Sequence, residues 1–240
     1  MAIETKRAGI GYWVAACAVC VLLYVATSIV LGMVASFGNS PEWTVLLLAV
    51  AVFSVMMSAT FAALYFSYRK TLSSDGLFAR REPFWQAGKI GFSAAAAVAM
   101  ACLPVLYQKL FLWAGIDIGA PPNQKIVIEL VKMLHPILGI LYVAVFAPVA
   151  EELLFRGLVF NLFGRLGKRW QQAAALLLSS LLFALPHLPE IDEWAGMYAL
   201  MGLALGAVYL KTRDIRYPVA VHMLNNILGL SMIYMQIQAV

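Results

Sequence analysis

A cluster of charged side chains interrupts an otherwise apolar stretch of this chain, in the segment Glu151-Glu152-Leu-Leu-Phe-Arg156. Burying such groups is costly, so each needs a partner or a function. On a helix, Glu152 and Arg156 are four residues apart with the glutamate on the N-terminal side, which is the better orientation for an ion pair. Glu151 is rotated by about 100° from Glu152 and cannot share that pair comfortably. An ion pair therefore explains Glu152 and Arg156, whereas Glu151 is left for a functional role.

Three more polar side chains, His187, His222 and Asn226, also interrupt apolar stretches. His222 and Asn226 are four residues apart and project from one face of a helix. Such a pair can simply hydrogen-bond neighbouring helices. His187 precedes an acidic loop and, by itself, fits a surface histidine. Taken one at a time, these residues need no functional explanation.

Their depth along the expected helices changes this interpretation. Measured from the basic end of each apolar stretch, the helical rise puts Glu151 about 18 Å deep and His187 about 21 Å deep. On the same scale, His222 and Asn226 lie roughly 8 to 14 Å deep. Three helices thus bring a carboxylate, two imidazoles and a carboxamide to overlapping depths. We expect a water-filled polar pocket within the membrane.

The composition requires a membrane as the solvent for these helices. Of 240 residues, 63% are hydrophobic, against about 45–50% in globular domains. Charged residues make up 12%, and the mean hydropathy is +0.85. A water-soluble fold of this size could not hide so much apolar surface. The sequence predicts an all-α membrane protein, a polytopic helical bundle that forms a single membrane-embedded unit over residues 1–240.

Seven apolar runs are long enough to be spans of about 20 helical residues, or slightly fewer where flanking residues snorkel. They are approximately Ile10–Phe37, Trp43–Tyr68, Ile90–Trp113, Ile126–Phe163, Ala173–Pro186, Trp194–Leu210 and Tyr217–Gln238. The fourth run is long and contains charges. Its part from Glu129 to Lys132 can instead form an interfacial helix, which would raise the number of membrane-associated helices to eight.

The loop charges predict the orientation of these spans. Of 17 basic residues, 13 lie at the N-terminus or in the second, fourth and sixth loops, all on one side of the bundle. By the positive-inside rule that side, with the N-terminus, is cytoplasmic, and the C-terminus is external. The net charge of +5 therefore reflects topology, and nucleic-acid binding is excluded as a function class. We expect an integral protein of the plasma (inner) membrane.

Two further patterns are interpreted as packing. Gly202 and Gly206 form a small-xxx-small pattern that favours close approach of two helices. Cys17 and Cys20 have the spacing of a redox motif, but they stand inside an apolar run, without the βαβ context of such motifs, where thiols are inert.

Three motifs, in chain order, resemble those of the CPBP intramembrane proteases, the CAAX prenyl endopeptidase (Ras-converting enzyme) type with its bacteriocin-processing relatives. Glu151-Glu152-Leu-Leu-Phe-Arg156 is similar to the EExxxR motif, Phe183-Ala-Leu-Pro-His187 to FxxxH, and His222-Met-Leu-Asn-Asn226 to HxxxN. The resemblance implies a catalytic core over residues 135–236, preceded by N-terminal helices in residues 1–125. It also implies that the chain is an intramembrane endopeptidase.

The resemblance implies a role for each motif residue. Glu151 would activate the hydrolytic water, with His187 holding or polarising it, and His222 and Asn226 would stabilise the oxyanion. The supporting residues are Glu152 and Arg156, which would hold the geometry, and Phe183, which would line the site. This agrees with what peptide hydrolysis needs: a positioned water, a base, and donors where negative charge develops.

Two mechanisms remain open at this stage. Because two histidines and a glutamate can bind Zn²⁺, a metalloprotease with Glu151, His187 and His222 as ligands is an alternative. The spacing is not that of an HExxH zinc motif, and a carboxamide is a poor zinc ligand. The sequence therefore favours a cofactor-free mechanism driven by the glutamate.

Two other function classes compete with the protease. One is a non-catalytic membrane immunity or partner-binding protein on the same scaffold, and the other is a small transporter or proton relay. A binding role would not require these four residue types, and no inverted repeat favours transport. The partners we expect are the lipid bilayer and a membrane-associated or prenylated peptide substrate.

Overall fold

The computed structural model describes residues 10–37, 43–72, 83, 85–133, 136–164 and 168–238, and within these ranges every regular element is a helix. The elements are α1 (Ile10–Phe37), α2 (Trp43–Leu72), α3 (Ala87–Trp113), α4 (Pro122–Met133), α5 (Pro136–Ile140), η1 (Leu141–Phe146), α6 (Ala147–Glu152), η2 (Leu153–Val159), α7 (Phe160–Gly164), α8 (Arg169–Ala184), η3 (Leu185–His187), α9 (Ala195–Thr212) and α10 (Arg216–Gln238). A helix satisfies its own backbone hydrogen bonds, as lipid requires. The predicted all-α polytopic fold is confirmed. The predicted basic segments at residues 6–7, 73–82 and 165–167 lie outside the described residues.

Among the described residues, six helical segments are long and apolar enough to cross a membrane: α1, α2, α3, the run from α5 to α7, α9 and α10. The seventh predicted span, Ala173–Pro186, corresponds to α8 and the start of η3, and α8 has only 16 residues. At the helical rise it measures roughly 24 Å, less than the hydrocarbon thickness of about 30 Å. By length alone the structure therefore supports six of the seven predicted spans. The chain is an integral, multi-pass membrane protein.

The long fourth run divides at its charges, as the alternative interpretation of Glu129 to Lys132 predicts. Its first part forms the separate helix α4, with Glu129 and Lys132 paired at 3.7 Å on an exposed face and Val131 buried. Its second part forms one continuous helical path from α5 to α7. This path contains two wide turns, η1 and η2, in which backbone hydrogen bonds reach back five residues, for example from Phe160 N–H to the Phe155 carbonyl. Such turns often occur at functional sites.

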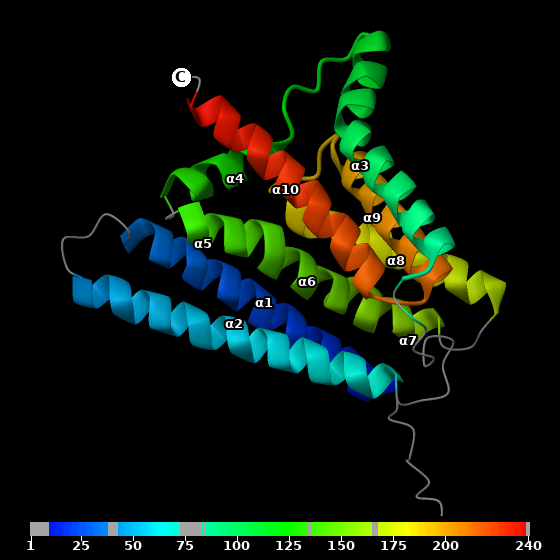
Figure 1. The fold of residues 1–240 in the computed structure, drawn as a ribbon, viewed down its shortest axis with the longest axis horizontal. Helices are drawn as coiled ribbons and strands as arrows, with labels where there is room; N and C mark the ends of the chain where they lie inside the picture. Colours follow the sequence, from blue (N-terminus) through cyan, green and yellow to red (C-terminus); the bar gives the residue numbers. More distant parts are fainter. Residues whose placement is uncertain are drawn as a thin grey trace, which may run out of the picture.

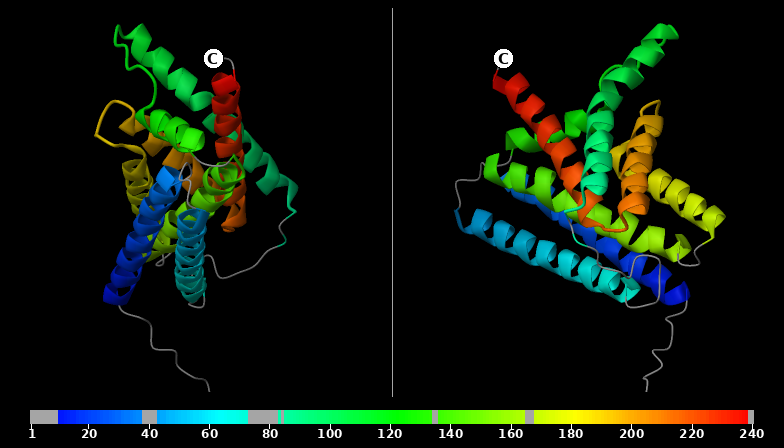
Figure 2. Two further views of the ribbon diagram at one scale, coloured as in Figure 1. Left: turned by 90° about the vertical axis from the view of Figure 1, so that its left-hand side faces the viewer. Right: turned by 45° about the vertical axis from the view of Figure 1, so that its right-hand side comes forward.

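The helix from α5 to α7 lies at the centre of the bundle. The antiparallel pair α1 and α2 packs along one side of it, and α8, α9 and α10 lie on the other (Figures 1 and 2). Its middle section is consequently almost sealed from the surroundings, and every residue from Ala150 to Asn161 is buried. A polar group in this section must find its partners inside the protein.

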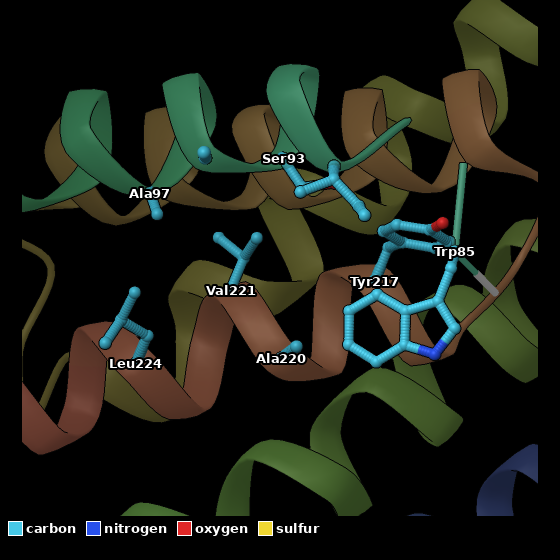
Figure 3. A pocket seen from close by; sticks show the side chains of 9 residues that line it. Trp85, Ser93, Ala97, Tyr217, Ala220, Val221 and Leu224 are labelled. Atoms are coloured by element: carbon cyan, nitrogen blue, oxygen red, sulfur yellow. The ribbon is translucent and has the colours of Figure 1, made fainter. Parts of the chain in front are cut away.

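Helices α3 and α10 pack together near their N-terminal ends and spread apart towards their C-terminal ends (Figure 1). Where they meet, they enclose an apolar pocket of about 200 Å³. Trp85 and Tyr217 lie at one end of this pocket, and Ala97 and Leu224 at the other (Figure 3).

The small-xxx-small pattern serves packing, as predicted. A Cβ atom added to Gly202 of α9 would lie 2.8 Å from the Cα of Ser180 in α8, closer than real Cβ atoms approach a backbone. At Gly206 an added Cβ would collide with the side chain of Leu176, also in α8. The two glycines therefore allow α9 to lie directly against α8, which keeps the polar residues of the two helices in register.

Candidate active site

The two adjacent glutamates at the end of α6 are both buried but have different partners. Glu152 Oε1 accepts a hydrogen bond from Arg156 Nη1 at 2.8 Å, and both side chains are completely inaccessible. The predicted ion pair is therefore confirmed. The same Oε1 lies 3.0 Å from Nδ1 of His222. Arg156 Nη2 donates to the carbonyl of Gly202 at 2.8 Å, so that this charge pair ties the central helix to α9 and α10.

Glu151 is rotated away from that pair, as the helical spacing predicts. Its Oε1 accepts a hydrogen bond from the hydroxyl of Tyr24 in α1 at 2.6 Å. Its Oε2 is buried, and no described protein group donates a hydrogen bond to it. This oxygen faces Nε2 of His187 and Nε2 of His222, each 3.9 Å away. That separation is too long for a direct hydrogen bond but suits a bridging water molecule.

The His187 ring is held so that Nε2 points at Glu151. Its Nδ1 lies 2.9 Å from the carbonyl of Phe183, and a carbonyl only accepts, so Nδ1 carries the hydrogen. In the neutral ring Nε2 then has a free lone pair. The ring stacks on Tyr198 at 4.9 Å between centroids and packs against Phe183 at 4.7 Å. Both contacts restrict its rotation.

His222 and Asn226 lie on one face of α10, as predicted, and both line the same cavity. The Nδ1 of His222 is directed to the Glu152 carboxylate, which leaves Nε2 facing the site. The Asn226 amide donates one hydrogen bond to the carbonyl of Val143 at 2.8 Å. An amide nitrogen carries two hydrogens, so one donor remains. Phe183 also lines the cavity, and its ring lies against His187, His222 and Arg156.

The cavity that contains these groups has a volume of about 300 Å³. Its walls come from α3, α4, α9, α10, η1 and the α8–η3 region. The lining residues are Met100, Pro104, Pro121, Asn123, Gln124, Val127, Val143, Phe183, His187, Met197, Tyr198, Met201, His222, Asn225, Asn226, Gly229, Leu230, Met232, Ile233 and Gln236. The structure thus brings His187, His222 and Asn226 together around one cavity, with Glu151 buried directly behind the two histidines.

Sequence reasoning missed two aromatic residues of this site. Tyr24 stands inside the first apolar run, 127 residues before Glu151, and Tyr198 stands near the start of α9. The one signal for Tyr24 is a phenolic hydroxyl in the middle of a span, where it needs a hydrogen-bond partner. Nothing in the spacing identifies that partner as Glu151.

The Glu151, His187 and His222 set has the donor types that zinc prefers but not the spacing. Zinc ligands at about 2.0–2.1 Å from the ion lie roughly 3.3 Å from one another in a tetrahedral site. Here the separations from Glu151 Oε2 to the two Nε2 atoms are 3.9 Å. Across the described part of the chain, no group of three His, Cys, Asp or Glu residues is arranged to hold a metal ion.

Comparison with known proteins agrees with the motifs. Residues 133–228 match the family described as type II CAAX prenyl endopeptidase Rce1-like. A curated relative, the membrane-embedded CAAX protease MroQ of Staphylococcus aureus, is 31% identical over 140 residues, which cover 57% of this chain and 53% of that protein. The chain thus matches about half the length of this relative. No solved structure matches the chain significantly. The predicted resemblance to CPBP-type proteases is confirmed.

Proposed function

We propose that this chain, whose residues 133–228 match the CAAX prenyl endopeptidases, is an intramembrane endopeptidase that hydrolyses membrane-associated peptides. One observation carries the proposal. The buried carboxylate of Glu151 has an oxygen without a protein donor, and the Nε2 atoms of two histidines face it at 3.9 Å beside a cavity. A binding protein or a packing contact does not require this arrangement, whereas a hydrolase needs a base with room for a water molecule.

In the proposed reaction, a water molecule between Glu151 Oε2 and His187 Nε2 attacks the peptide carbonyl carbon and gives its proton to Glu151. His187 accepts a hydrogen bond from this water through its free lone pair and so holds it. Because Tyr24 occupies Oε1, the carboxylate presents Oε2 to the water in one orientation. Positioning a base and its water in this way contributes about 10²- to 10⁴-fold in rate.

The negative charge that develops on the carbonyl oxygen needs donors. His222 supplies one when it is doubly protonated, and Glu152 stabilises this imidazolium through Nδ1. The second Asn226 N–H supplies the other. When the C–N bond breaks, Glu151 returns its proton to the amine, and the carboxylate is regenerated. The chain's own residues are therefore sufficient to complete the proposed catalytic cycle without a cofactor.

The test compares the termini of membrane peptides by mass spectrometry in cells that carry the wild-type chain or Glu151→Gln at matched protein levels. We expect new termini only with the wild type. Glu129→Gln is the matched control, because Glu129 is an exposed glutamate of α4 outside the cavity. It should cleave like the wild type. Identical termini in all three samples, with folded protein, would support the non-catalytic immunity or partner-binding function instead.

The relatives suggest the general class of the substrate but not whether it is prenylated. The names of the matched family and of the staphylococcal relative both refer to CAAX proteases. We propose a membrane-associated peptide or protein as the substrate, in the plasma (inner) membrane of the cell. Mass-spectrometric identification of the new termini also reports whether the cleaved chains carry a prenyl group.

A further inference from the structure

The catalytic cavity is built at one end of the bundle. It is lined by α3 at Met100 and Pro104, by the first turns of α9 and by the start of α4. The lining residues of α10 extend from His222 to Gln236, and Val143, Phe183 and His187 complete the wall. Because α3 and α10 run from the basic end and α9 runs towards it, most of this lining lies towards the end opposite the basic loops. This is where α3 and α10 spread apart (Figure 1).

Towards the basic end the site is closed by packing. The residues that follow Arg156 on the central helix include Leu158 and Phe160, which are fully buried, and Phe160 packs edge-on against buried Tyr209 of α9. The pocket between α3 and α10 at that end is a separate, apolar space lined by none of the candidate site residues (Figure 3). The cavity therefore gives water and peptide access from one end of the bundle to His187 and His222, which lie beside Glu151.

The charge distribution predicts on which side of the membrane the cavity end lies. The sequence assigns 13 of the 17 lysines and arginines to the loops at the basic end. Among the described residues, the cavity end carries Asp117, Glu190, Asp192 and Glu193 together with Lys125. The positive-inside rule places the basic end in the cytoplasm. We propose that the catalytic cavity opens to the external face of the membrane and accepts an uncharged segment of a polypeptide that lies at that face. The polypeptide nature of the ligand rests on the proposed function, but the side of the opening does not.

The cavity lining supports the uncharged character of the segment. Four carboxamide residues, Asn123, Gln124, Asn225 and Gln236, join thioether and aromatic side chains along the walls. Carboxamides can both donate to and accept from a peptide backbone, while Met and Tyr side chains pack against apolar groups. Such a wall offers hydrogen bonds to the backbone and apolar contact to the side chains of the segment.

Thiol labelling tests the opening without any use of activity. In a full-length chain with Cys17, Cys20 and Cys102 changed to alanine, single cysteines are introduced and treated with a charged, membrane-impermeant maleimide. Leu230→Cys lies in the cavity wall, and Leu228→Cys lies on the exposed face of the same helix. Lys168→Cys marks the basic end. Right-side-out and inverted membrane vesicles present the external and cytoplasmic faces respectively.

We expect Leu230→Cys to react at least tenfold faster in right-side-out vesicles, Lys168→Cys only in inverted ones, and Leu228→Cys in neither. If Leu230→Cys does not fold, Gln236→Cys at the cavity mouth replaces it, with the same expectation. Faster labelling of the cavity cysteine from the basic side, or labelling from neither side, would overturn the proposal.

A hydrolysis readout separates this proposal from the proposed function. In right-side-out vesicles of the Leu230→Cys variant, maleimide should abolish cleavage of an uncharged reporter peptide added outside, and a reporter with Lys in the cleaved segment should be cut at least tenfold more slowly. Unchanged cleavage after complete labelling, or equal cleavage of both reporters, would overturn the assigned segment. Labelling from outside in a chain that never cleaves any peptide would contradict the protease function and leave the external opening supported.

Discussion

The adjacent residues Glu151 and Glu152 have the same side chain but different surroundings. Around Glu152 every element contributes a partner: Arg156 from the same helix, His222 from α10, and the Gly202 carbonyl of α9 as the second acceptor for the arginine. Around Glu151 one oxygen is held by Tyr24, and the other, without a protein donor, faces the Nε2 atoms of His187 and His222, which line the cavity. One residue of helical rotation, about 100°, separates the carboxylate of the ion pair from the carboxylate that we propose as the base.

The difference teaches that burial alone does not identify the reactive group. Both glutamates are buried, Glu152 completely and Glu151 to 95%. Each glutamate also has one buried oxygen, Oε2, without a donor among the described residues. What distinguishes them is that Glu152 is paired with the buried Arg156 cation, whereas Glu151 Oε2 faces the Nε2 atoms of His187 and His222. A carboxylate that is paired with a buried cation holds helices together, whereas one without such a cation is available for a substrate or a water molecule. The following predictions test this comparison.

The largest effect should come from Glu151→Gln, which keeps the size and the polarity of the side chain but removes the base. We expect peptide hydrolysis by the purified protein to fall by about 10²- to 10⁴-fold. The thermal unfolding temperature should stay close to that of the wild type, because Glu151 Oε2 accepts no hydrogen bond from the described residues. Activity within a few-fold of the wild type would show that the comparison assigns the base to the wrong region.

Arg156→Met should have the opposite profile, a loss of stability that exceeds any specific effect on chemistry. It leaves the Glu152 charge buried without its cation, and breaking a buried pair from one side costs about 3–5 kcal/mol. Unfolding in mixed micelles measures the change. The control is the double variant Glu152→Leu with Arg156→Met, which removes both charges and should recover part of the loss. A single variant as stable as the wild type would contradict a structural role for the pair.

The sequence predicts the contacts within one helix well and the contacts between helices only in part. The Glu152–Arg156 pair and the shared face of His222 and Asn226 are local, so helical spacing is enough to derive them. The meeting of Glu151 with His187 and His222 is not local, but the overlapping depths of these residues in a bilayer are a strong constraint, and they led to the prediction of a shared pocket. In a membrane protein the depth of a residue along its helix can thus be estimated from the sequence, which is not possible for a soluble fold.

The parts that could not be predicted depend on rotation and tilt of one helix against another. Tyr24 reaches Glu151 because α1 presents that face to the central helix, and nothing in an apolar run of 28 residues marks the face. The wide turn η2, which follows the glutamates, contains no proline that would mark it in the sequence, and all of its residues are buried. The short length of α8 likewise depends on where η3 turns the chain.

A smaller effect is expected where α9 supports the structural carboxylate. Gly202→Ala should destabilise the fold by about 1–3 kcal/mol, because the new Cβ meets the backbone of α8 near Ser180 and not a flexible side chain. Gly229→Ala is the matched control, since an added Cβ there has nothing within 4 Å and should be neutral or slightly stabilising. Unfolding of the two variants under identical conditions gives the comparison, and equal stabilities would argue against close α8–α9 packing.

Tyr24→Phe tests whether α1 belongs to the reactive region. The change removes the hydroxyl that donates to Glu151 Oε1 and leaves the ring, which stacks on Phe146, in place. We expect kcat to fall about tenfold with KM nearly unchanged, since one hydrogen bond to a charged group is worth about 1.5–3 kcal/mol and water can replace part of it. Ser28→Ala, one turn further along α1, is the control. A tenfold rise in KM with kcat unchanged would make Tyr24 a binding residue instead.

Removal of metal ions should have the smallest effect of all. If Glu151 acts on water directly, dialysis against a chelator leaves the rate within about twofold of the untreated enzyme, since no step in general base catalysis requires a metal. The 3.9 Å separations between Glu151 Oε2 and the two histidines are wider than a tetrahedral zinc site, so an ion would have to draw the three side chains together. The contacts of His187 with Phe183 and Tyr198 oppose such a movement. A loss of activity that zinc restores, together with one bound zinc per chain by mass spectrometry, would therefore mean that the reactive region rearranges around a metal while the Glu152 region stays as it is.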